Sequence, residues 1–378
     1  MIPSTEDRKY QICARCVMDT TDPDIIFDDK GVCNHCHTYD RSITQGLFTG
    51  DEGKRKLAEI VHKIQENGKN KEYDCIIGVS GGVDSSFVAY KVKELGLRPL
   101  AVHLDNGWDS ELAVKNIERI LNHLRIPLYT HVMDWEEFMD LQLAFLRAST
   151  PDSEIPTDHA IFALMIQLAK KYNVPVITGM NMKTESHLPR AWSQGHTDWR
   201  YIKSVHKRFG KVKLTTFPHL HIWAFLIYFR SGQWIDILNY LDYRKEDTKK
   251  FLIEELSWKD YGWKHHESIY TRFYQGYILP KRFGYDKRKT HLSSLICSGE
   301  ISREIALEEL RREPYPIEMQ NADKEYLLKK FNLTSRDFDE IMNQPRKSID
   351  DYHNYQFLFN NFMYKQLRLI YRQYKKST

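Results

Sequence analysis

The chain has 378 residues, of which 42% are hydrophobic and 28% charged, and its formal net charge is +4. This is the composition of a soluble globular protein, and the length allows two domains or one large domain with attachments. The longest apolar run, residues 222–229, is far shorter than the roughly 20 residues that a membrane span needs. The N-terminus has no apolar signal core. We therefore expect a cytoplasmic protein without membrane insertion.

Two cysteine pairs stand near the N-terminus, in the stretches CARC and CNHC. Their spacing is typical of a zinc site, and the four expected ligands are Cys13, Cys16, Cys33 and Cys36. Four thiolates leave no open position on the metal, so this zinc is expected to be structural. Disulfides are the alternative, and a cytosolic chain disfavours them. His35 or His37 could replace a neighbouring cysteine as a ligand.

Strands and helices alternate along the next part of the chain, after a first amphipathic helix at 52–67. The expected strands are 75–79, 99–104, 127–132 and 174–178, and the expected helices are 84–95, 110–124, 135–147 and 158–172. Short apolar strands that alternate with helices predict an α/β fold, a Rossmann-like doubly wound parallel sheet covered on both faces.

The alternation is expected to stop near residue 200. Further helices are expected at 222–230, 246–256, 302–312, 323–331, 335–343 and near 354–375. Between them, residues 257–295 are rich in Trp, Tyr and basic residues, which suggests a substrate-binding or capping region. We therefore expect three parts: a zinc module with a linker (1–50), the α/β domain (51–200) and a mostly helical C-terminal region (201–378).

The loop SGGVDSS at 80–86 follows the first strand of the expected sheet, where ligands bind in open α/β folds. Glycines let the backbone curl around an anion, and free N–H groups at a helix start favour negative charge. Asp84 beside a phosphate indicates Mg²⁺ between them. The predicted phosphate-binding residues are Ser80, Gly81, Gly82, Asp84, Ser85 and Ser86. The alternative is a glycine-rich turn with ordinary helix caps.

The loop has no lysine, unlike the G-x-x-x-x-G-K-S/T phosphate loop, and it resembles the PP-loop S-G-G-x-D-S of the N-type ATP pyrophosphatases. That resemblance implies that the loop grips the pyrophosphate leaving group while a substrate oxygen attacks the α-phosphate of ATP. It implies that Asp105, in AVHLDNGW, lies near the nucleotide. It also implies that TGMNMKTE supplies Gly179 and Asn181 to ATP and Glu185 to Mg²⁺.

The whole chain is similar to the N-acetyl sugar amidotransferases of the WbpG and PseA type, which act in bacterial surface-polysaccharide (lipopolysaccharide O-antigen) biosynthesis. The similar stretches are CARCVMDTTDP, GVCNHC, GVSGGVDSS and KHHESIYTRFYQGYILPKRFGYDKRKTHLSSLI. The resemblance implies that ATP adenylates the acetamido oxygen of a free or nucleotide-linked sugar. Ammonia then displaces AMP to give an acetamidino sugar.

The resemblance also implies two protein partners, a separate glutaminase subunit and a histidine-biosynthesis-like ammonia-channel protein. No glutaminase setting is recognisable around the two remaining cysteines, Cys75 and Cys297.

Two basic stretches in the second half are candidates for the substrate side of the site. KHHES offers Lys264 and His265 as catalytic bases for ammonia. PKRFGYDKRKTH offers cations for the negative charges of a sugar nucleotide, and the predicted residues are Arg282, Lys287, Arg288 and His291. A solvated basic face is the alternative, and the histidines could equally be core or surface residues.

The main alternative function is that of a tRNA-thiolating PP-loop enzyme, some of which also carry an N-terminal zinc module. Such enzymes need a cysteine pair near the active site, and here only Cys75 and Cys297 remain, each alone. A non-enzymatic nucleotide sensor is a third possibility. We therefore expect a sugar substrate and no nucleic-acid partner.

Overall fold

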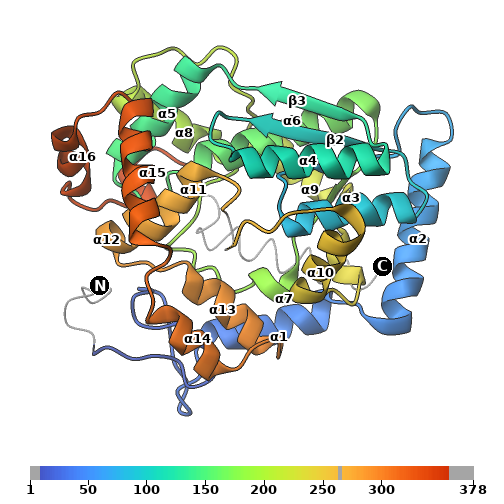
Figure 1. Cartoon of the computed structure of the whole chain (residues 1–378), viewed down its shortest axis with the longest axis horizontal. Coiled ribbons are helices and arrows are strands. Elements are labelled where there is room, and N and C mark those ends of the chain that lie inside the picture. Colours follow the sequence, from blue (N-terminus) through green and yellow to red (C-terminus); the bar gives the residue numbers. More distant parts are fainter. Residues whose placement is uncertain (1–8, 263–265, 357–378) are drawn as a thin grey trace.

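The computed structural model describes residues 9–262 and 266–356, and a five-stranded parallel sheet forms its centre (Figure 1). The strands are β1 (Cys75–Gly78), β2 (Pro99–Asp105), β3 (Leu128–Val132), β4 (Val176–Thr178) and β5 (Trp234–Asp236). They lie in the order β3-β2-β1-β4-β5, and every neighbouring pair is parallel. In β1, Ile76 pairs with Leu100 of β2 on one side and with Val176 of β4 on the other.

Helices cover both faces of this sheet. Successive residues of a strand point to opposite faces, so Ile76 and Ile77 belong to two different buried clusters. The cluster around Ile76 includes side chains of α5 (Trp135–Ala148), α6 (Ile155–Tyr172) and α8 (Trp199–Phe209). The cluster around Ile77 includes side chains of α2 (Gly50–Gly68), α3 (Val83–Glu94), α4 (Glu111–Leu124) and α10 (Lys245–Leu256). The predicted doubly wound parallel sheet is confirmed.

Local signals begin and end these helices. The side chain of Ser110 accepts a hydrogen bond from the N–H of Ala113 at the start of α4, and Asp134 accepts one from Glu137 at the start of α5. Arg125 and Ser149, which follow α4 and α5, have left-handed backbone conformations that terminate a helix. The expected helix boundaries in this region are therefore close to the observed ones.

The fifth strand was not expected. The expectation that the strands stop near residue 200 is wrong, because β5 follows that point. It pairs with β4 from Val176↔Trp234 to Thr178↔Asp236. Three residues are too short to show a hydrophobic period, so no sequence pattern indicates this strand. As a result, the sheet crosses the boundary that was expected at residue 200.

The remaining helical segments lie mostly in the C-terminal part. They are α1 (Asn34–Gly46), α7 (Met182–Glu185), α9 (Ile222–Arg230), η2 (Ile237–Tyr240), α11 (Ile269–Phe273), η3 (Tyr274–Ile278), α12 (Leu279–Phe283), α13 (Arg288–Cys297), α14 (Arg303–Leu310), α15 (Ile317–Lys330), α16 (Ser335–Met342) and η4 (Ile349–Asp351). The helix expected near 354–375 lies outside the described residues from 357 onward. No helix of the described ranges is both long enough and apolar enough to cross a bilayer.

The N-terminal cysteine segment packs against helices from the far end of the chain. Figure 1 shows it, in blue, beside α13 and α14, in orange. Val17 shares a buried cluster with Leu292 of α13 and Ala306 of α14. The guanidinium of Arg303 donates to the carbonyl oxygens of Cys13 and Cys16, both at 3.0 Å. The cysteine segment and the helices α13 and α14 therefore form one packed unit.

Candidate active site

The strand order reverses between β1 and β4, which places a topological switch point between the loops that follow these two strands. The loops are in close contact. A Cβ atom added at Gly179, just after β4, would lie 3.2 Å from the backbone and Cβ of Asp84. In open α/β sheets ligands bind in the crevice at this position. The geometry therefore brings SGGVDSS and Gly179 to one site.

The loop after β1 is tightly curled. Gly81 has a φ of +77°, and a Cβ atom there would lie 2.5 Å from the carbonyl oxygen of Ala113. The hydroxyl oxygens of Ser80 and Ser85 are 3.2 Å apart, and the N–H of Gly82 donates to the hydroxyl of Ser80 at 3.3 Å. Only glycine fits this position without strain. The loop thus has the close-packed backbone that an anion site requires.

Two features of the loop region fit ATP with Mg²⁺. The carboxylate of Asp84, in the first turn of α3, accepts a hydrogen bond from the hydroxyl of Tyr243, so it is held in a fixed position. The amide oxygen of Asn181 accepts from the N–H and hydroxyl of Thr184, whereas its buried Nδ2 has no hydrogen-bond partner within residues 9–262 and 266–356. A carboxylate suits Mg²⁺, and an unpaired buried donor suits a ligand oxygen.

A large cavity of about 1340 Å³ opens beside these loops. The predicted residues that line it are Ser80, Ser85, Gly179, Glu185, Lys287, Arg288 and His291. The predicted residues of the described chain that do not line it are Gly81, Gly82, Asp84, Ser86, Asp105, Asn181 and Arg282. Ligand pockets usually measure about 300–1,000 Å³. This cavity therefore has room for a nucleotide and a second substrate together.

Residues 258–262 cover the phosphate loop, in the segment where a capping region was expected. The indole N–H of buried Trp258 donates to the carbonyl oxygen of Gly81 at 2.8 Å. Lys259 and Asn116 exchange hydrogen bonds of 2.8 and 3.0 Å, which fix the segment to α4. The two predicted bases, Lys264 and His265, come next and lie outside the described residues.

The four predicted substrate-binding residues have different surroundings. The ammonium of Lys287 lies 3.8 Å from a carboxylate oxygen of Glu154. The guanidinium of Arg288 pairs with Asp286 and also donates to two backbone carbonyls. His291 lies on the cavity wall.

Arg282 differs from the other three because its guanidinium is buried. It donates to the carbonyl oxygen of Leu146 at 3.0 Å and to the hydroxyl of Ser149 at 2.6 Å. Its place in the basic run suggested a site residue, but α12 directs its side chain into the protein. There it binds the C-terminal end of α5. We therefore do not retain it in the proposed substrate site.

Asp105 and Ser86 likewise do not line the cavity. Asp105 ends β2, and its carboxylate accepts from the N–H of Gly107 at 2.9 Å. Ser86 is buried in α3. In place of Asp105, the cavity wall next to β2 is formed by His103 and Asp109, whose Nε2 and Oδ2 atoms are 3.3 Å apart.

Sequence reasoning missed a polar cluster on the same cavity wall. The imidazole Nε2 of His196 lies 3.4 Å from a carboxylate oxygen of Asp158, 3.5 Å from one of Asp152 and 3.0 Å from the hydroxyl of Ser193. Asp158, Ser193 and His196 line the cavity. The acidic stretch TPDSEIPTD before α6 was a weak signal. However, its partners lie in a separate loop, and no spacing rule joins the two.

The pKa values of this cluster are strongly shifted. Desolvation within the cavity raises the pKa of Asp158 to about 6, although its side chain is 45% exposed. Burial alone would also raise the pKa of Asp152, but Lys287 and His196 hold it below its ordinary value. For His196, the two carboxylates outweigh burial and raise the pKa. Asp158 therefore titrates closer to neutral pH than an ordinary aspartate, which suits a general base.

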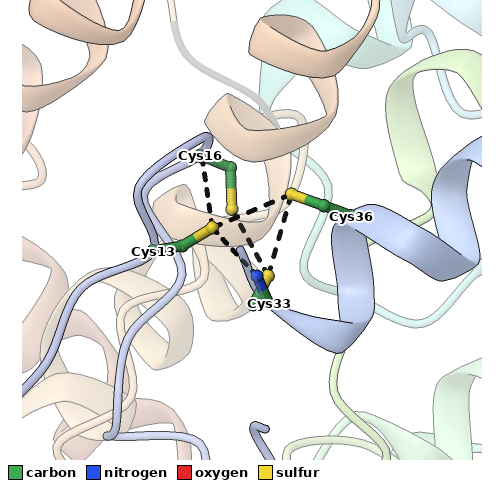
Figure 2. Close-up of side chains that lie close together, drawn as sticks. All are labelled: Cys13, Cys16, Cys33 and Cys36. Atoms are coloured by element: carbon green, nitrogen blue, oxygen red, sulfur yellow. Dashed lines mark hydrogen bonds between the residues drawn. The ribbon is translucent and has the colours of Figure 1, made fainter. Parts of the chain in front are cut away.

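The four N-terminal cysteines point toward one another, as Figure 2 shows. The Sγ–Sγ distances are 3.7 Å for Cys16–Cys33, 3.7 Å for Cys33–Cys36 and 3.9 Å for Cys13–Cys36. A tetrahedral zinc with Zn–S bonds of about 2.3 Å requires about 3.8 Å between sulfurs. The cluster, which is fully buried, could hold zinc.

The two histidines that were possible alternative ligands have other partners. The Nε2 atom of His35 lies 2.6 Å from Asp22, and that of His37 lies 2.8 Å from Asp28. Neither belongs to a metal-binding group found among the described residues.

Residues 267–368 match the family described as LPS biosynthesis protein WbpG-like, C-terminal domain. The match covers about a quarter of the chain, in its C-terminal part, and does not include the loop at Ser80. The matched residues include the helices α11 to α16. One of them, α13, carries Arg288 and His291 on the cavity wall.

One similarity concerns a short stretch of the chain. A tRNA(Ile)-lysidine synthase from Chlamydia pneumoniae is 36% identical over 70 residues, which are 18% of this chain and 22% of that protein. The chain thus spans about a fifth of the length of this relative.

Two solved structures match this chain at low TM-scores. For NMN synthetase from Francisella tularensis the TM-score is 0.28 at 20% identity, covering 35% of this chain and 57% of that chain. For an NH3-dependent NAD synthetase from Campylobacter jejuni the TM-score is 0.31 at 15% identity, covering 78% and 98%.

Replacing Gly81 by alanine tests the packing of the phosphate loop. We expect Gly81→Ala to lower the free energy of unfolding by about 1–3 kcal/mol more than Gly232→Ala, and to weaken ATP binding. Both glycines have a φ near +75°, but a Cβ at Gly232 meets nothing within 4 Å. Urea unfolding and calorimetric ATP titration measure the two effects. Equal losses in the two variants would contradict the packing described here.

Replacing Cys16 by serine tests whether the four-cysteine cluster binds zinc. We expect Cys16→Ser to lower the zinc content and the melting temperature, by at least about 5 °C, because metal binding stabilises the folded module. Elemental analysis and thermal unfolding provide the measurements. Cys75→Ala is the control, since Cys75 lies buried in β1. A zinc-free wild-type protein with the same melting temperature would refute the prediction.

Proposed function

We propose that this protein is an ATP-dependent, AMP-forming ligase, and more specifically an amidotransferase that acts on an N-acetyl sugar. The observation that carries the proposal is the cavity beside the phosphate loop, with a wall contributed by the WbpG-like domain. A loop without lysine suits a pyrophosphate that leaves, and the size of the cavity suits two substrates. The proposed pathway is lipopolysaccharide O-antigen or related surface-glycan biosynthesis, which the family description supports.

The chemistry explains why ATP is needed. The carbon of an acetamido group is a poor electrophile, and its oxygen is a poor leaving group. Attack of that oxygen on the α-phosphate of ATP forms a C–O–P linkage and releases pyrophosphate. Ammonia then adds to the activated carbon, the C–O bond breaks with loss of AMP, and the excess proton passes to a base. The product is an acetamidino sugar, and the enzyme mainly orients the reactants and stabilises charge.

We assign the nucleotide side of the cavity to the two loops at the switch point. The backbone and hydroxyls of residues 80–85 hold the pyrophosphate, and Gly179 and Asn181 lie toward the rest of ATP, with His103 and Asp109 in place of the predicted Asp105. Asp84 and Glu185 are the proposed Mg²⁺ ligands. When bound, Mg²⁺ offsets the charge that builds up on the phosphate oxygens. Tyr243 orients Asp84 through its hydrogen bond.

We assign the sugar side to the wall formed by α13 and the preceding loop. Lys287 and His291 line the cavity and provide cationic or hydrogen-bonding groups for a nucleotide-linked sugar. Arg288 is held by Asp286 and by backbone carbonyls, so we propose that it positions this wall and contributes positive charge to it.

We propose that the Asp158–His196 pair accepts the proton from the attacking ammonia. The pair lies on the cavity wall, and its carboxyl pKa near 6 suits this role. Lys264 and His265 remain further candidates for the base.

The proposed source of ammonia is a separate glutaminase subunit, with a channel protein that delivers NH3 to the carboxyl end of the sheet. Cys75 is a poor candidate for a glutaminase nucleophile because burial in β1 raises its pKa. Cys297 lies beside the zinc cluster, 3.7 Å from Cys36.

The tRNA-thiolating alternative has less support. Cys75 lies in the central strand and Cys297 at the end of α13. They do not form the cysteine pair that sulfur transfer requires.

Product analysis tests the proposed function. With a diacetamido sugar nucleotide, ATP and ammonium, we expect AMP, pyrophosphate and a sugar product lighter by about one mass unit, because NH replaces O. Asp84→Asn should lower kcat by about 10²-fold or more, since the proposed Mg²⁺ site loses a charge, while the exposed Asp51→Asn changes nothing. Chromatography and mass spectrometry measure the products. ADP as the sole substrate-dependent nucleotide product would refute adenylation.

The pH profile tests the Asp158–His196 pair. At a constant concentration of unprotonated NH3, kcat/KM should rise as the pH passes through about 6, because the ionised form of Asp158 accepts protons. Asp158→Asn should remove this rise and lower the rate by about 10²-fold. The control variant Asp339→Asn, at an exposed position, should keep both the rise with pH and the wild-type rate.

Stability measurements give a second readout for Asp158. Its folded-state pKa lies above the ordinary value of 3.8, so the unfolded state binds fewer protons between about pH 4 and 6. The free energy of unfolding should therefore fall as the pH rises through this window. Asp158→Asn should lose that contribution. A variant with the wild-type pH profile for both rate and stability would exclude the assignment.

A further inference from the structure

A second group of metal-ligating side chains adjoins the four-cysteine cluster. It consists of Cys36 in α1, His187 after α7 and Cys297 at the end of α13. The Sγ atoms of Cys36 and Cys297 are 3.7 Å apart, and the Sγ of Cys297 lies 3.6 Å from the Nε2 of His187. All three ligand atoms lie within 4.8 Å of one another. Cys36 thus belongs to both groups.

These distances match those of ligands around one metal ion. With Zn–S bonds of about 2.3 Å and Zn–N bonds of about 2.05 Å, tetrahedral angles place two sulfurs about 3.8 Å apart and a sulfur and a nitrogen about 3.6 Å apart. Thiolate and imidazole are also the ligand types that zinc prefers in proteins.

The orientation of His187 is an independent observation. The side chain is fully buried, and its Nδ1 lies 2.9 Å from the hydroxyl of Ser294. This contact fixes the ring so that Nε2 faces Cys297. A metal-binding histidine is commonly held in this way, with one ring nitrogen on a hydrogen-bond partner and the other on the metal. Neither Ser294 nor His187 is needed to complete the four-cysteine cluster.

We propose that Cys36, His187 and Cys297 bind a second metal ion, with the thiolate of Cys36 shared between the two ions. The first ion has Cys13, Cys16, Cys33 and Cys36 as ligands and is closed. The second ion has three protein ligands and a fourth position for water or a small ligand, the arrangement that distinguishes open from closed zinc sites. The ligand set suits Zn²⁺.

The position of this site links three parts of the protein. Helices α1, α7 and α13 are in contact with one another, and each carries or precedes one of the ligands. The hydroxyl of Tyr39 in α1 also donates to the carbonyl of Lys183 in α7, at 3.3 Å. Because α7 follows the loop at Gly179 and His187 lines the cavity, the second ion ties the cysteine module to the wall of the proposed active site.

The metal content of the full-length protein tests this proposal without any assay of activity. After expression with zinc and removal of loosely bound ions by gel filtration, elemental analysis should find two zinc ions per wild-type chain. Cys297→Ala and His187→Asn should each retain one, and Cys75→Ala should retain two. Cooperative thermal unfolding of His187→Asn separates loss of a ligand from loss of the fold.

Cobalt substitution gives an independent readout. Wild-type protein titrated with Co²⁺ should show two equivalents of tetrahedral absorption, and Cys297→Ala one. A wild-type chain that holds one metal ion, with the same content in Cys297→Ala and His187→Asn, would overturn the proposal. Loss of all metal from Cys297→Ala while its thermal unfolding stays cooperative would also overturn it, because the four-cysteine site would then depend on Cys297.

Discussion

The approach of Gly179 to the backbone of Asp84 is the contact on which the arrangement of the site depends. Two loops from the middle of a parallel sheet can meet this closely only where a side chain is missing, and a Cβ atom at Gly179 would lie 3.2 Å from Asp84. Gly81 makes the same kind of contact with the backbone of α4. Together the two glycines hold the loop between its neighbours, so that Ser80 and Ser85 face the cavity.

The segment that matches the WbpG-like domain supplies a wall of the cavity that the sheet alone cannot form. A parallel sheet supplies the phosphate loop at its carboxyl edge, but the opposite wall must come from elsewhere in the chain. Here α13 begins on that wall with Arg288 and His291 and ends beside the cysteine cluster with Cys297. One short helix therefore joins the cysteine cluster to the proposed substrate side of the cavity.

The parts of the fold that the sequence predicted are those that depend on local pattern. The alternating strands and helices, the loop at Ser80 and the paired cysteines each lie within a short stretch whose spacing carries the information. β5 was missed because three residues show no period, and Arg282 was misplaced because a basic run does not reveal which members a helix turns inward.

The features that could not be predicted are contacts between distant segments. The Asp152–Asp158–His196 cluster joins two loops, and the approach of Cys297 to Cys36 joins the first helix to the thirteenth. Such contacts are determined by the packing of the whole core. Each residue taken alone resembles an ordinary surface acid, a buried histidine or an isolated thiol.

The docking of the cysteine turns on Arg303 has a consequence for the order in which the protein is made. The ribosome releases Cys13 and Cys16 before Arg303, whose side chain binds their carbonyls, and about 290 residues separate the two. At about 5–20 residues per second this delay is about 15 to 60 s. The cysteine turns therefore wait for the synthesis of α14 before they can reach their final surroundings.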